Sequence, residues 1–379
     1  MTESAFTNAR IVLGDEIVDG SIRIVDGTIA AVDAGGSVGE DCEGDYLIPG
    51  LIELHTDQLE AHYRPRPGVY WNPLGALMAH DVQIAGSGIT TVFDAVRIGS
   101  EPEQSEGGMG DHIEVLIEAI TAGVADGRLR ADHLVHLRCE LPTPDVVDDF
   151  ERFCDLPLVR LASVMDHTPG QRQYQTMGKF VAFYKERMRF SDAEIDAFIA
   201  ARRERQQRYA AASRAAILKR GLAAGIAFAS HDDATPEHVA ESVRDGVSIA
   251  EFPTTMVAAE QSHAAGLAVL MGAPNVVRGG SHSGNIAATD LAREGCLDVL
   301  SSDYVPGALI QAAFMLPQVV EGVGLPRAIG MVTATPARAA HLADRGEIAS
   351  GKRADLVRVR LHGDMPVIRG VWRQGRRVS

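Results

Sequence analysis

The sequence predicts an α/β fold, a (β/α)8 TIM barrel with a small β-sandwich domain built from both chain termini. Eight apolar, strand-like runs alternate with helical segments between residues 50 and 344, which is the pattern of repeated βα units. Short β segments broken by Gly and Asp occupy residues 1–49 and 345–379, and neither piece is long enough to bury a core alone. We therefore expect a composite β domain of residues 1–49 plus 345–379 and a barrel of residues 50–344.

The two ends of the chain have the same character. Residues 9–34 contain ARIVLGDEIVDG, SIRIVDG and TIAAVDA, in which apolar residues alternate and turn residues intervene. This pattern predicts a meander of small strands. The segment from Glu347 onward, EIASGKRADLVRVRLHGDMPVIRGVWRQGRRVS, again contains short β segments and follows a helical stretch near residues 335–343.

The barrel strands are predicted from eight runs in chain order: LIELHTD, ITTVFDA, LVHLRCE, VRLASVMDH, IAFASHDD, VSIAEFP, LAVLMGAP and DVLSSDY. Residues 170–190, after the fourth run, exceed a normal strand-to-helix connection and predict an inserted lid. The helix that follows begins with the capping box SDAE at Ser191. We expect its many basic residues to form a solvated face.

Composition excludes several classes of protein. The formal net charge of -15 argues against a nucleic-acid binder, because phosphate backbones are held by broad basic surfaces. The four cysteines are scattered without metal-binding spacing and are expected to be buried free thiols of a cytosolic protein. The polar N-terminus and the lack of an apolar run near ~20 residues predict a soluble, cytoplasmic protein without a membrane partner.

Polar residues gather where the predicted strands end. A single strand-end histidine is more often a hydrogen-bonded structural residue, but a ring of His, Asp and Glu favours a divalent cation. Barrel enzymes place their chemistry at this rim. The strand-end residues are His55, Asp57, Asp94, Glu140, His167, His231, Glu251, Asn275 and Asp303. Histidines away from strand ends, His80, His133 and His136 among them, are expected to have surface or packing roles.

Several motifs resemble the amidohydrolase superfamily: DGTIAAVD, LIPGLIELHTD, ASHDD, SSDY and GEIASGKRADLV. Others resemble, within it, the diphosphatases of the carbon-phosphorus lyase pathway: HTDQLEAHYRPRPGV, AHDVQIAGSGITTVFDA, HLRCELPTP, MDHTPGQRQY and NVVRGGSHSGN. The resemblance spans nearly the whole chain. It implies hydrolysis of α-D-ribose 1-methylphosphonate 5-triphosphate to the 5-phosphate and diphosphate in phosphonate catabolism, with one or two divalent ions, zinc being the expected metal.

The resemblance also implies a ligand set, consisting of His55, Asp57, Glu140, His167, His231 and Asp303. Glu140 stands where relatives have a carboxylated lysine or a glutamate. Asp303 is the implied catalytic residue, which orients the attacking water and takes its proton. The two later histidines end the fourth and fifth runs by our count, whereas many relatives use the fifth and sixth strands, and both assignments stay open.

Cationic and hydrogen-bonding residues for the polyphosphate are expected in the rim loops, since the arginine fork suits phosphate oxygens. The candidates are Arg64, Arg66, Gln171, Arg172, Tyr174, Lys179, Arg278, Ser281, His282 and Ser283. Glycines such as Gly279 and Gly280 are expected to let backbone N–H groups approach the anion. The alternative for each arginine is a solvated loop. The implied partner is a small phosphorylated sugar, and a homo-oligomer is left open.

Two other functions are compatible with the same fold. An amidohydrolase acting at carbon, such as a cyclic amide or ureide hydrolase or a deaminase, would need few arginines in the rim loops. A non-catalytic scaffold would have lost part of the ligand set. The sequence carries several rim arginines and a full set of ligand types, which favours the diphosphatase, although the fold alone does not decide.

Overall fold

The computed structural model describes residues 2–33, 38–99, 112–172, 191–281 and 284–379. Most of the lid that the sequence predicted, together with Tyr174, Lys179, His282 and Ser283, lies outside the described residues. The chain divides into two compact units. Unit 1 comprises Met1–Asp94, Glu118–Leu134 and Leu270–Ser379, and unit 2 comprises Ala95–Ile117 and Val135–Val269.

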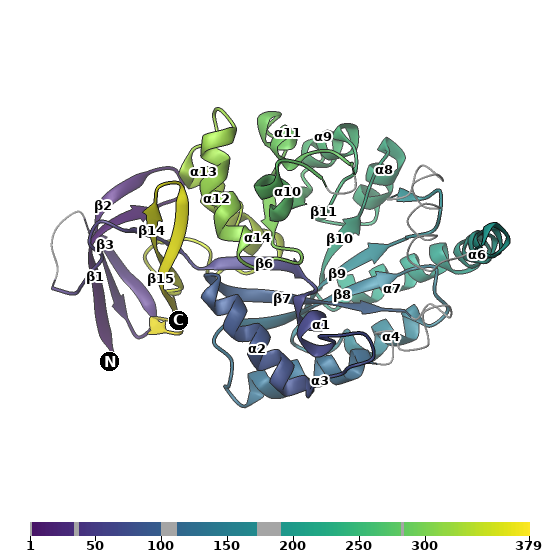
Figure 1. Ribbon diagram of the computed structural model, residues 1–379, viewed down its shortest axis with the longest axis horizontal. Helices are drawn as coiled ribbons and strands as arrows, with labels where there is room; N and C mark the ends of the chain where they lie inside the picture. Colours follow the sequence, from purple (N-terminus) through teal and green to yellow (C-terminus); the bar gives the residue numbers. More distant parts are fainter. Residues whose placement is uncertain (1, 34–37, 100–111, 173–190, 282–283) are drawn as a thin grey trace. The chain divides into compact units, whose positions relative to one another are not determined.

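One mixed sheet of unit 1 is formed by strands from both ends of the chain. Its order is β16-β15-β14-β5-β1-β2-β3, and β4 pairs with β1. Figure 1 shows the N-terminal strands in purple beside the C-terminal strands in yellow. The strands are β1 (Glu3–Val12), β2 (Ile17–Val25), β3 (Thr28–Asp33), β4 (Glu40–Asp41), β5 (Tyr46–Pro49), β14 (Leu356–His362), β15 (Met365–Arg373) and β16 (Arg376–Arg377). The prediction that both termini build one β structure is confirmed.

Apolar side chains on one face of this sheet form its core. Phe6 of β1 and Trp372 of β15 pack edge to face with ring centroids 4.7 Å apart. Ile11, Ile22 and Leu356 are fully buried in the same cluster. Burial of such side chains contributes about 1.5–3 kcal/mol each, so the sheet depends on residues from both ends of the chain.

The second sheet holds eight parallel strands in the order β13-β12-β11-β10-β9-β8-β7-β6. Its strands are β6 (Leu51–Thr56), β7 (Ile89–Ile98), β8 (Asp132–Glu140), β9 (Val159–Met165), β10 (Ala227–His231), β11 (Ile249–Glu251), β12 (Ala268–Gly272) and β13 (Val299–Ser301). A parallel bridge between Thr56 and Asp303 joins the residues after β13 to the end of β6. Each predicted run overlaps one strand, with β7 and β8 extending beyond their runs, and the barrel class is confirmed.

Helices follow the barrel strands, as the βα pattern predicted. They are α1 (Gln58–Tyr63), α2 (Pro73–Gly86), α3 (Ile113–Ala125), α4 (Val146–Phe153), α6 (Asp192–Arg205), α7 (Ala211–Ala223), α8 (Pro236–Arg244), α9 (Met256–Ala264), α10 (Ala273–Arg278), α11 (Ala288–Arg293), α12 (Ala308–Val319), α13 (Leu325–Gly330) and α14 (Ala334–Ala339). Threonine side chains cap α8 and α9, because Thr235 and Thr255 accept hydrogen bonds from N–H groups of the first turn.

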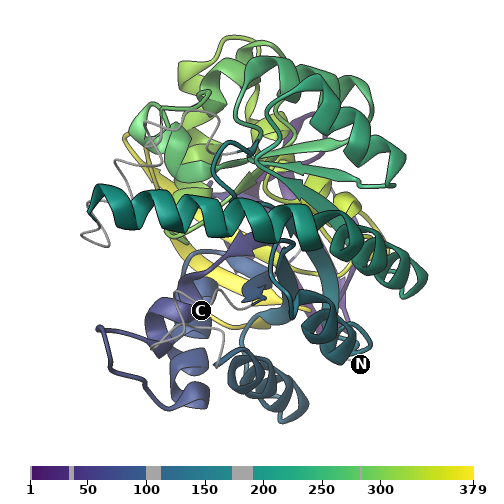
Figure 2. The same cartoon turned by 90° about the vertical axis from the view of Figure 1, so that its right-hand side faces the viewer.

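The long helical run of unit 2 begins at the predicted capping box, where Ser191 and Glu194 exchange hydrogen bonds. Helix α6 continues through a π-helical turn, η4 (Gln206–Ala210), into α7, and Figure 2 shows this run in teal. The prediction of a solvated basic face was wrong for Arg202. That side chain is buried, and its Nη1 donates a hydrogen bond to the carbonyl oxygen of His167.

All four cysteines are buried free thiols, as the sequence predicted. Burial raises the pKa of the Cys42 thiol to about 11, so this side chain is a neutral thiol at physiological pH. Among the described helices, none combines the length and the apolar character that crossing a membrane requires.

Candidate metal centre

Unit 2 brings four predicted strand-end residues to one edge of its parallel strands. Glu140 ends β8, His167 follows β9, His231 ends β10 and Glu251 ends β11. The carboxyl ends of parallel strands meet at the same edge of a sheet, which is where barrel enzymes carry their chemistry.

The four residues form two buried histidine–carboxylate pairs. Nδ1 of His167 lies 2.5 Å from Oε2 of Glu140, and Nδ1 of His231 lies 2.6 Å from Oε2 of Glu251. A carboxylate accepts a hydrogen bond from Nδ1–H, which leaves the lone pair of Nε2 available to a metal ion. Both imidazoles are therefore oriented as ligands by a second residue.

Asp232 completes this group. Its Oδ2 lies 3.5 Å from Nε2 of His231 and 3.9 Å from Nε2 of His167. The same Oδ2 is buried and has no hydrogen-bond partner among the described residues. The three side chains offer ligand atoms within 4.8 Å of one another. A buried carboxylate oxygen without a partner is costly, and a cation bound by two imidazoles and a carboxylate would satisfy it.

The charge on Glu140 is maintained by its neighbours. Burial alone would raise the pKa of this carboxyl group, but the interactions with His167 and with Arg97, whose Nη2 lies 3.0 Å from Oε2, lower it below its ordinary value. Glu140 also accepts a hydrogen bond from the backbone N–H of His167. In this arrangement Glu140 orients His167, and its role as a direct ligand stays a prediction.

Backbone strain marks three residues that follow strand ends. Asp232, Phe252 and Asp303 follow β10, β11 and β13 and have φ values of 57°, 55° and 55°. Non-glycine residues in this region cost roughly 1–3 kcal/mol each and gather at functional sites. The ring of Phe252 packs edge to face on His231 at 5.5 Å, so the strained turn also holds that imidazole in place.

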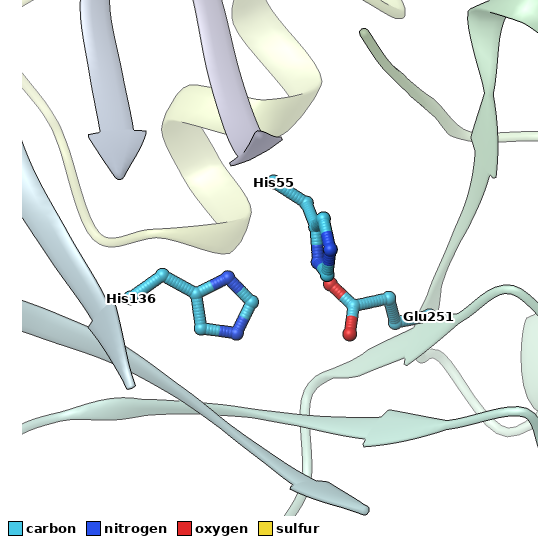
Figure 3. A group of neighbouring side chains, drawn as sticks. All are labelled: His55, His136 and Glu251. Atoms are coloured by element: carbon cyan, nitrogen blue, oxygen red, sulfur yellow. The ribbon is translucent and has the colours of Figure 1, made fainter. Parts of the chain in front are cut away.

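Figure 3 shows two further buried residues, His55 from β6 of unit 1 and His136 from β8 of unit 2, together with Glu251 from β11 of unit 2. The sequence predicted a surface or packing role for His136, whose ring is fully buried and whose Nε2 lies 3.0 Å from Oγ of Ser163. The alternation of side chains along a strand could have placed His136 near the site. It is four residues before Glu140 on the same strand and therefore points to the same face of the sheet.

In unit 1, Asp303 is attached to the end of β6. Its backbone N–H donates to the carbonyl oxygen of His55 at 3.1 Å, and Oγ1 of Thr56 donates to the carbonyl oxygen of Asp303 at 2.8 Å. Asp57 is half-buried where β6 leads into α1. Asp303 is thus hydrogen-bonded to the end of the strand that carries His55. The common ligand role of His55, Asp57 and Asp303 stays a prediction.

The expected polyphosphate contacts of unit 1 differ in exposure. Arg66 and Arg278 are exposed, whereas Arg64 and Ser281 are half-buried. The guanidinium of Arg64 lies 5.8 Å from the ring centroid of Tyr70. Nothing in these positions prevents the arginines from meeting an anion.

Two other expectations for anion binding change. The N–H groups of Gly279 and Gly280 donate to the carbonyl oxygens of Val276 and Asn275, so they end α10 and do not form the expected anion-binding nest. In unit 2, Gln171 is half-buried, whereas the buried Arg172 forms ion pairs with Asp233 and Glu241. Two carboxylates around one guanidinium favour a structural role for Arg172.

A separate ionic cluster is buried in unit 1. Asp94 of β7 accepts hydrogen bonds from Nε2 of His80 at 2.8 Å and Nδ1 of His133 at 2.7 Å, and Nε2 of His133 lies 3.3 Å from Oδ1 of Asp81. Burial would lower the pKa of His133, but the two carboxylates raise it to about 9. The cluster is therefore an imidazolium between two carboxylates, and His80 and His133 are core residues.

Comparison with known proteins agrees with this fold and with the histidines and carboxylates at the carboxyl ends of the barrel strands. A profile of the Amidohydrolase family matches residues 46–378, and the chain belongs to that family. The chain is 45% identical over 375 residues to the alpha-D-ribose 1-methylphosphonate 5-triphosphate diphosphatase of Escherichia coli (strain K12), covering 98% of this chain and 99% of the relative. Both resemblances drawn from the motifs are thereby confirmed.

Solved structures share the fold at low sequence identity. A putative prolidase from Bifidobacterium longum matches with a TM-score of 0.65 and 16% identity, over 99% of this chain and 94% of that chain. The N-acetylglucosamine-6-phosphate deacetylase from Pasteurella multocida matches with a TM-score of 0.64 and 14% identity, over 99% and 98%. At these identities the likeness shows the fold alone.

Proposed function

We propose that the chain is a metal-dependent diphosphatase that cleaves α-D-ribose 1-methylphosphonate 5-triphosphate to the 5-phosphate and diphosphate in phosphonate catabolism. The observation that carries the proposal is the 45% identity with the E. coli diphosphatase over 98% of the chain. Membership of the Amidohydrolase family and the oriented histidines at the strand ends support it.

The proposed metal centre of unit 2 consists of His167, His231 and Asp232, with Glu140 and Glu251 holding the two imidazoles. Two nitrogen donors and one carboxylate suit zinc, which is the proposed ion. When bound, a divalent ion supplies an acidic water and polarises a phosphoryl oxygen. We also retain Glu140, His55, Asp57 and Asp303 as proposed ligands, which would provide for one or two ions.

The chain's own residues have distinct proposed tasks. Asp303 accepts the proton of the attacking water, and its backbone, fixed to the end of β6, sets the position of that carboxylate. Arg64, Arg66, Arg278 and Ser281 contact the polyphosphate, where negative charge grows as the leaving group departs. Further proposed contacts of the polyphosphate are Gln171, Tyr174, Lys179, His282 and Ser283.

We further propose a cytoplasmic location and a small phosphorylated sugar as the partner of the site. The four buried free thiols support a reducing compartment. The oligomeric state is left open, and sedimentation of the purified chain would determine it.

The decisive experiment supplies the ribosyl triphosphate to the metal-loaded enzyme and identifies the products by phosphorus NMR. The proposal expects equimolar diphosphate and 5-phosphate. Release of inorganic monophosphate in place of diphosphate would contradict cleavage between the α-phosphorus and the bridging oxygen. Faster turnover of neutral amides or cyclic ureides than of any triphosphate would replace the proposal with a hydrolase acting at carbon. Elemental analysis of the same preparation identifies the metal.

A further inference from the structure

Unit 2 contains a polar pocket beside the candidate metal centre. Its lining includes Glu140, Thr143, His167, Thr168, Arg202 and Arg205. Two of these residues belong to the metal centre and its support, and two are arginines from α6 that the sequence did not single out. The pocket therefore combines a ligand histidine with two guanidinium groups.

The two arginines share one side of α6. Residues three apart are neighbours on a helix surface, and Arg202 and Arg205 both face the pocket. Arg202 is buried, donates from Nη1 to the carbonyl oxygen of His167 at 3.2 Å, and has its guanidinium 4.9 Å from the ring centroid of Phe198. Arg205 is half-buried and is the last residue of α6.

The helix is fixed to the loop that carries His167. Nε of Arg203 donates to the carbonyl oxygen of Pro169 at 3.4 Å, and Nε2 of Gln206 donates to Oδ2 of Asp166 at 3.3 Å. The π-helical turn η4 begins directly after Arg205, and such turns occur frequently at functional sites. These contacts hold both arginines at a set position relative to the imidazole of His167.

The only carboxylate that lines the pocket among the described residues is Glu140, and Glu140 is already bonded to His167 and Arg97. The pocket therefore favours an anion. Guanidinium groups bind phosphate oxygens through paired, charge-assisted hydrogen bonds, and the adjacent histidine would bring a metal-bound phosphate to the same place.

We propose that Arg202 and Arg205 bind the diphosphate part of the substrate and select for substrates with a polyphosphate chain. The inference rests on the proposed function. As the bond between the α-phosphorus and the bridging oxygen breaks, its electron pair goes to that oxygen, so negative charge grows on the departing diphosphate. Two guanidinium groups beside the metal centre stabilise this charge.

The test uses the metal-loaded full chain and inorganic diphosphate as the probe. Arg205→Ala is expected to weaken diphosphate binding, measured by calorimetry, about ten- to a hundredfold, while metal content stays at the parent level. The KM for the ribosyl triphosphate should rise by a similar factor. Arg205→Lys should recover only part of the diphosphate binding. Lysine keeps the positive charge but lacks the two parallel N–H donors of the guanidinium group.

Two variants of the same helical run serve as controls. Arg208→Ala removes an equal charge from an exposed position and should leave diphosphate binding unchanged. Arg203→Ala removes one contact to the His167 loop without changing the pocket lining. Because the contacts of Gln206 with Asp166 and of Arg202 with His167 remain, it should weaken diphosphate binding much less than Arg205→Ala does. Parent-like binding by Arg205→Ala would overturn the inference, and so would an equal loss in Arg203→Ala, which would assign the effect to loop position.

The outcomes separate this inference from the proposed function. A parent enzyme that binds diphosphate through Arg205 but leaves the ribosyl triphosphate intact would refute the diphosphatase and keep the anion site. A parent that hydrolyses the triphosphate while Arg205→Ala behaves normally would keep the diphosphatase and refute the anion site.

Discussion

Nδ1 of His231 lies 2.6 Å from Oε2 of Glu251, with both side chains buried. This pair determines which ring nitrogen of His231 faces Asp232. We expect Glu251→Gln to weaken the affinity for the proposed metal ion about ten- to a hundredfold, since loss of a carboxylate behind a ligand histidine has effects of this size. Competition with a chelator measures the affinity. Glu260→Gln, an exposed change on α9, is the matched control, and equal affinities in the two variants would contradict the assignment.

Asp232→Asn tests the proposed metal ligand that the sequence did not reveal. Asparagine tolerates the left-handed backbone of this position, where φ is 57°, so the exchange removes the charge with little added strain. We expect metal content after dialysis to fall well below the parent level and kcat to drop at least about a hundredfold. Elemental analysis and steady-state kinetics provide the two readouts. Full metal content in the variant would exclude Asp232 as a ligand.

The buried cluster of unit 1 predicts a pH dependence of stability. The pKa of His133 is raised from 6.5 to about 9, so its stabilising effect is complete below pH 6.5 and is lost as the pH rises through 9. The pKa of Asp94 is lowered from 3.8 to about 2, so its contribution is lost as the pH falls through that lower value. The combined contribution of His133 and Asp94 is therefore largest between pH 3.8 and 6.5. Burial lowers the pKa of His80 below 6.5, so the contribution of that residue decreases as the pH falls below this value.

Two measurements check this pH dependence. The thermal unfolding midpoint of the parent should decline between pH 6.5 and 9, and the ring signals of His133 in an NMR titration should shift near the upper value. The unfolding midpoint of the folded variant His133→Gln should not decline over this pH range. A His133 signal that titrates at its ordinary pKa would show that the two carboxylates do not hold the proton.

Asp132 at the start of β8 is surrounded by three arginines. Its carboxylate lies 2.6 Å from Arg345, 2.7 Å from Arg353 and 2.9 Å from Arg373. We expect Asp132→Asn to destabilise the protein by about 2 kcal/mol, because three guanidinium groups would face one another without a counter-charge, and partial exposure moderates the loss. Thermal unfolding measures the change. The exposed substitution Asp364→Asn should change stability by less than about 0.5 kcal/mol.

The rim arginines of unit 1 predict a dependence on substrate charge. Arg64→Ala and Arg278→Ala should each lower kcat/KM for the triphosphate about ten- to a hundredfold, the effect of one charge-assisted contact. The loss should be smaller for a diphosphate analogue, and metal content should stay at the parent level. Equal kcat/KM in parent and variants would identify both arginines as solvated loop residues.

The barrel strands were predictable because each is a short apolar run bounded by turn residues, and burial on both faces makes such runs conspicuous. His167 and His231 could be predicted for a related reason. Each is a titratable side chain that ends an apolar run, and such a position indicates a functional role. Asp232 could not be found in this way. Alternation places it on the face opposite His231, but its left-handed backbone breaks the alternation and returns the carboxylate toward Nε2 of His231.

Arg202 and Asp94 show a second limit of the sequence. The basic run of α6 looks solvated because helical spacing does not reveal which face will meet a loop from another element, and the contact with His167 depends on tertiary packing. Asp94 stands near a strand end in the sequence. Its carboxylate nevertheless bonds to His80 of α2 and to His133 of β8, which sequence order does not indicate.

The shared terminal sheet has a consequence for synthesis. Asp45, just before β5, bonds to Arg358 of β14 across 313 residues of chain. At translation rates of about 5–20 residues per second, Asp45 leaves the ribosome roughly 15–60 s before its partner. During that interval the edge of β5 that later pairs with β14 is open, and an open edge is a template for pairing with other chains. The nascent N-terminal strands therefore carry an unpaired edge until the C-terminal strands have been synthesised.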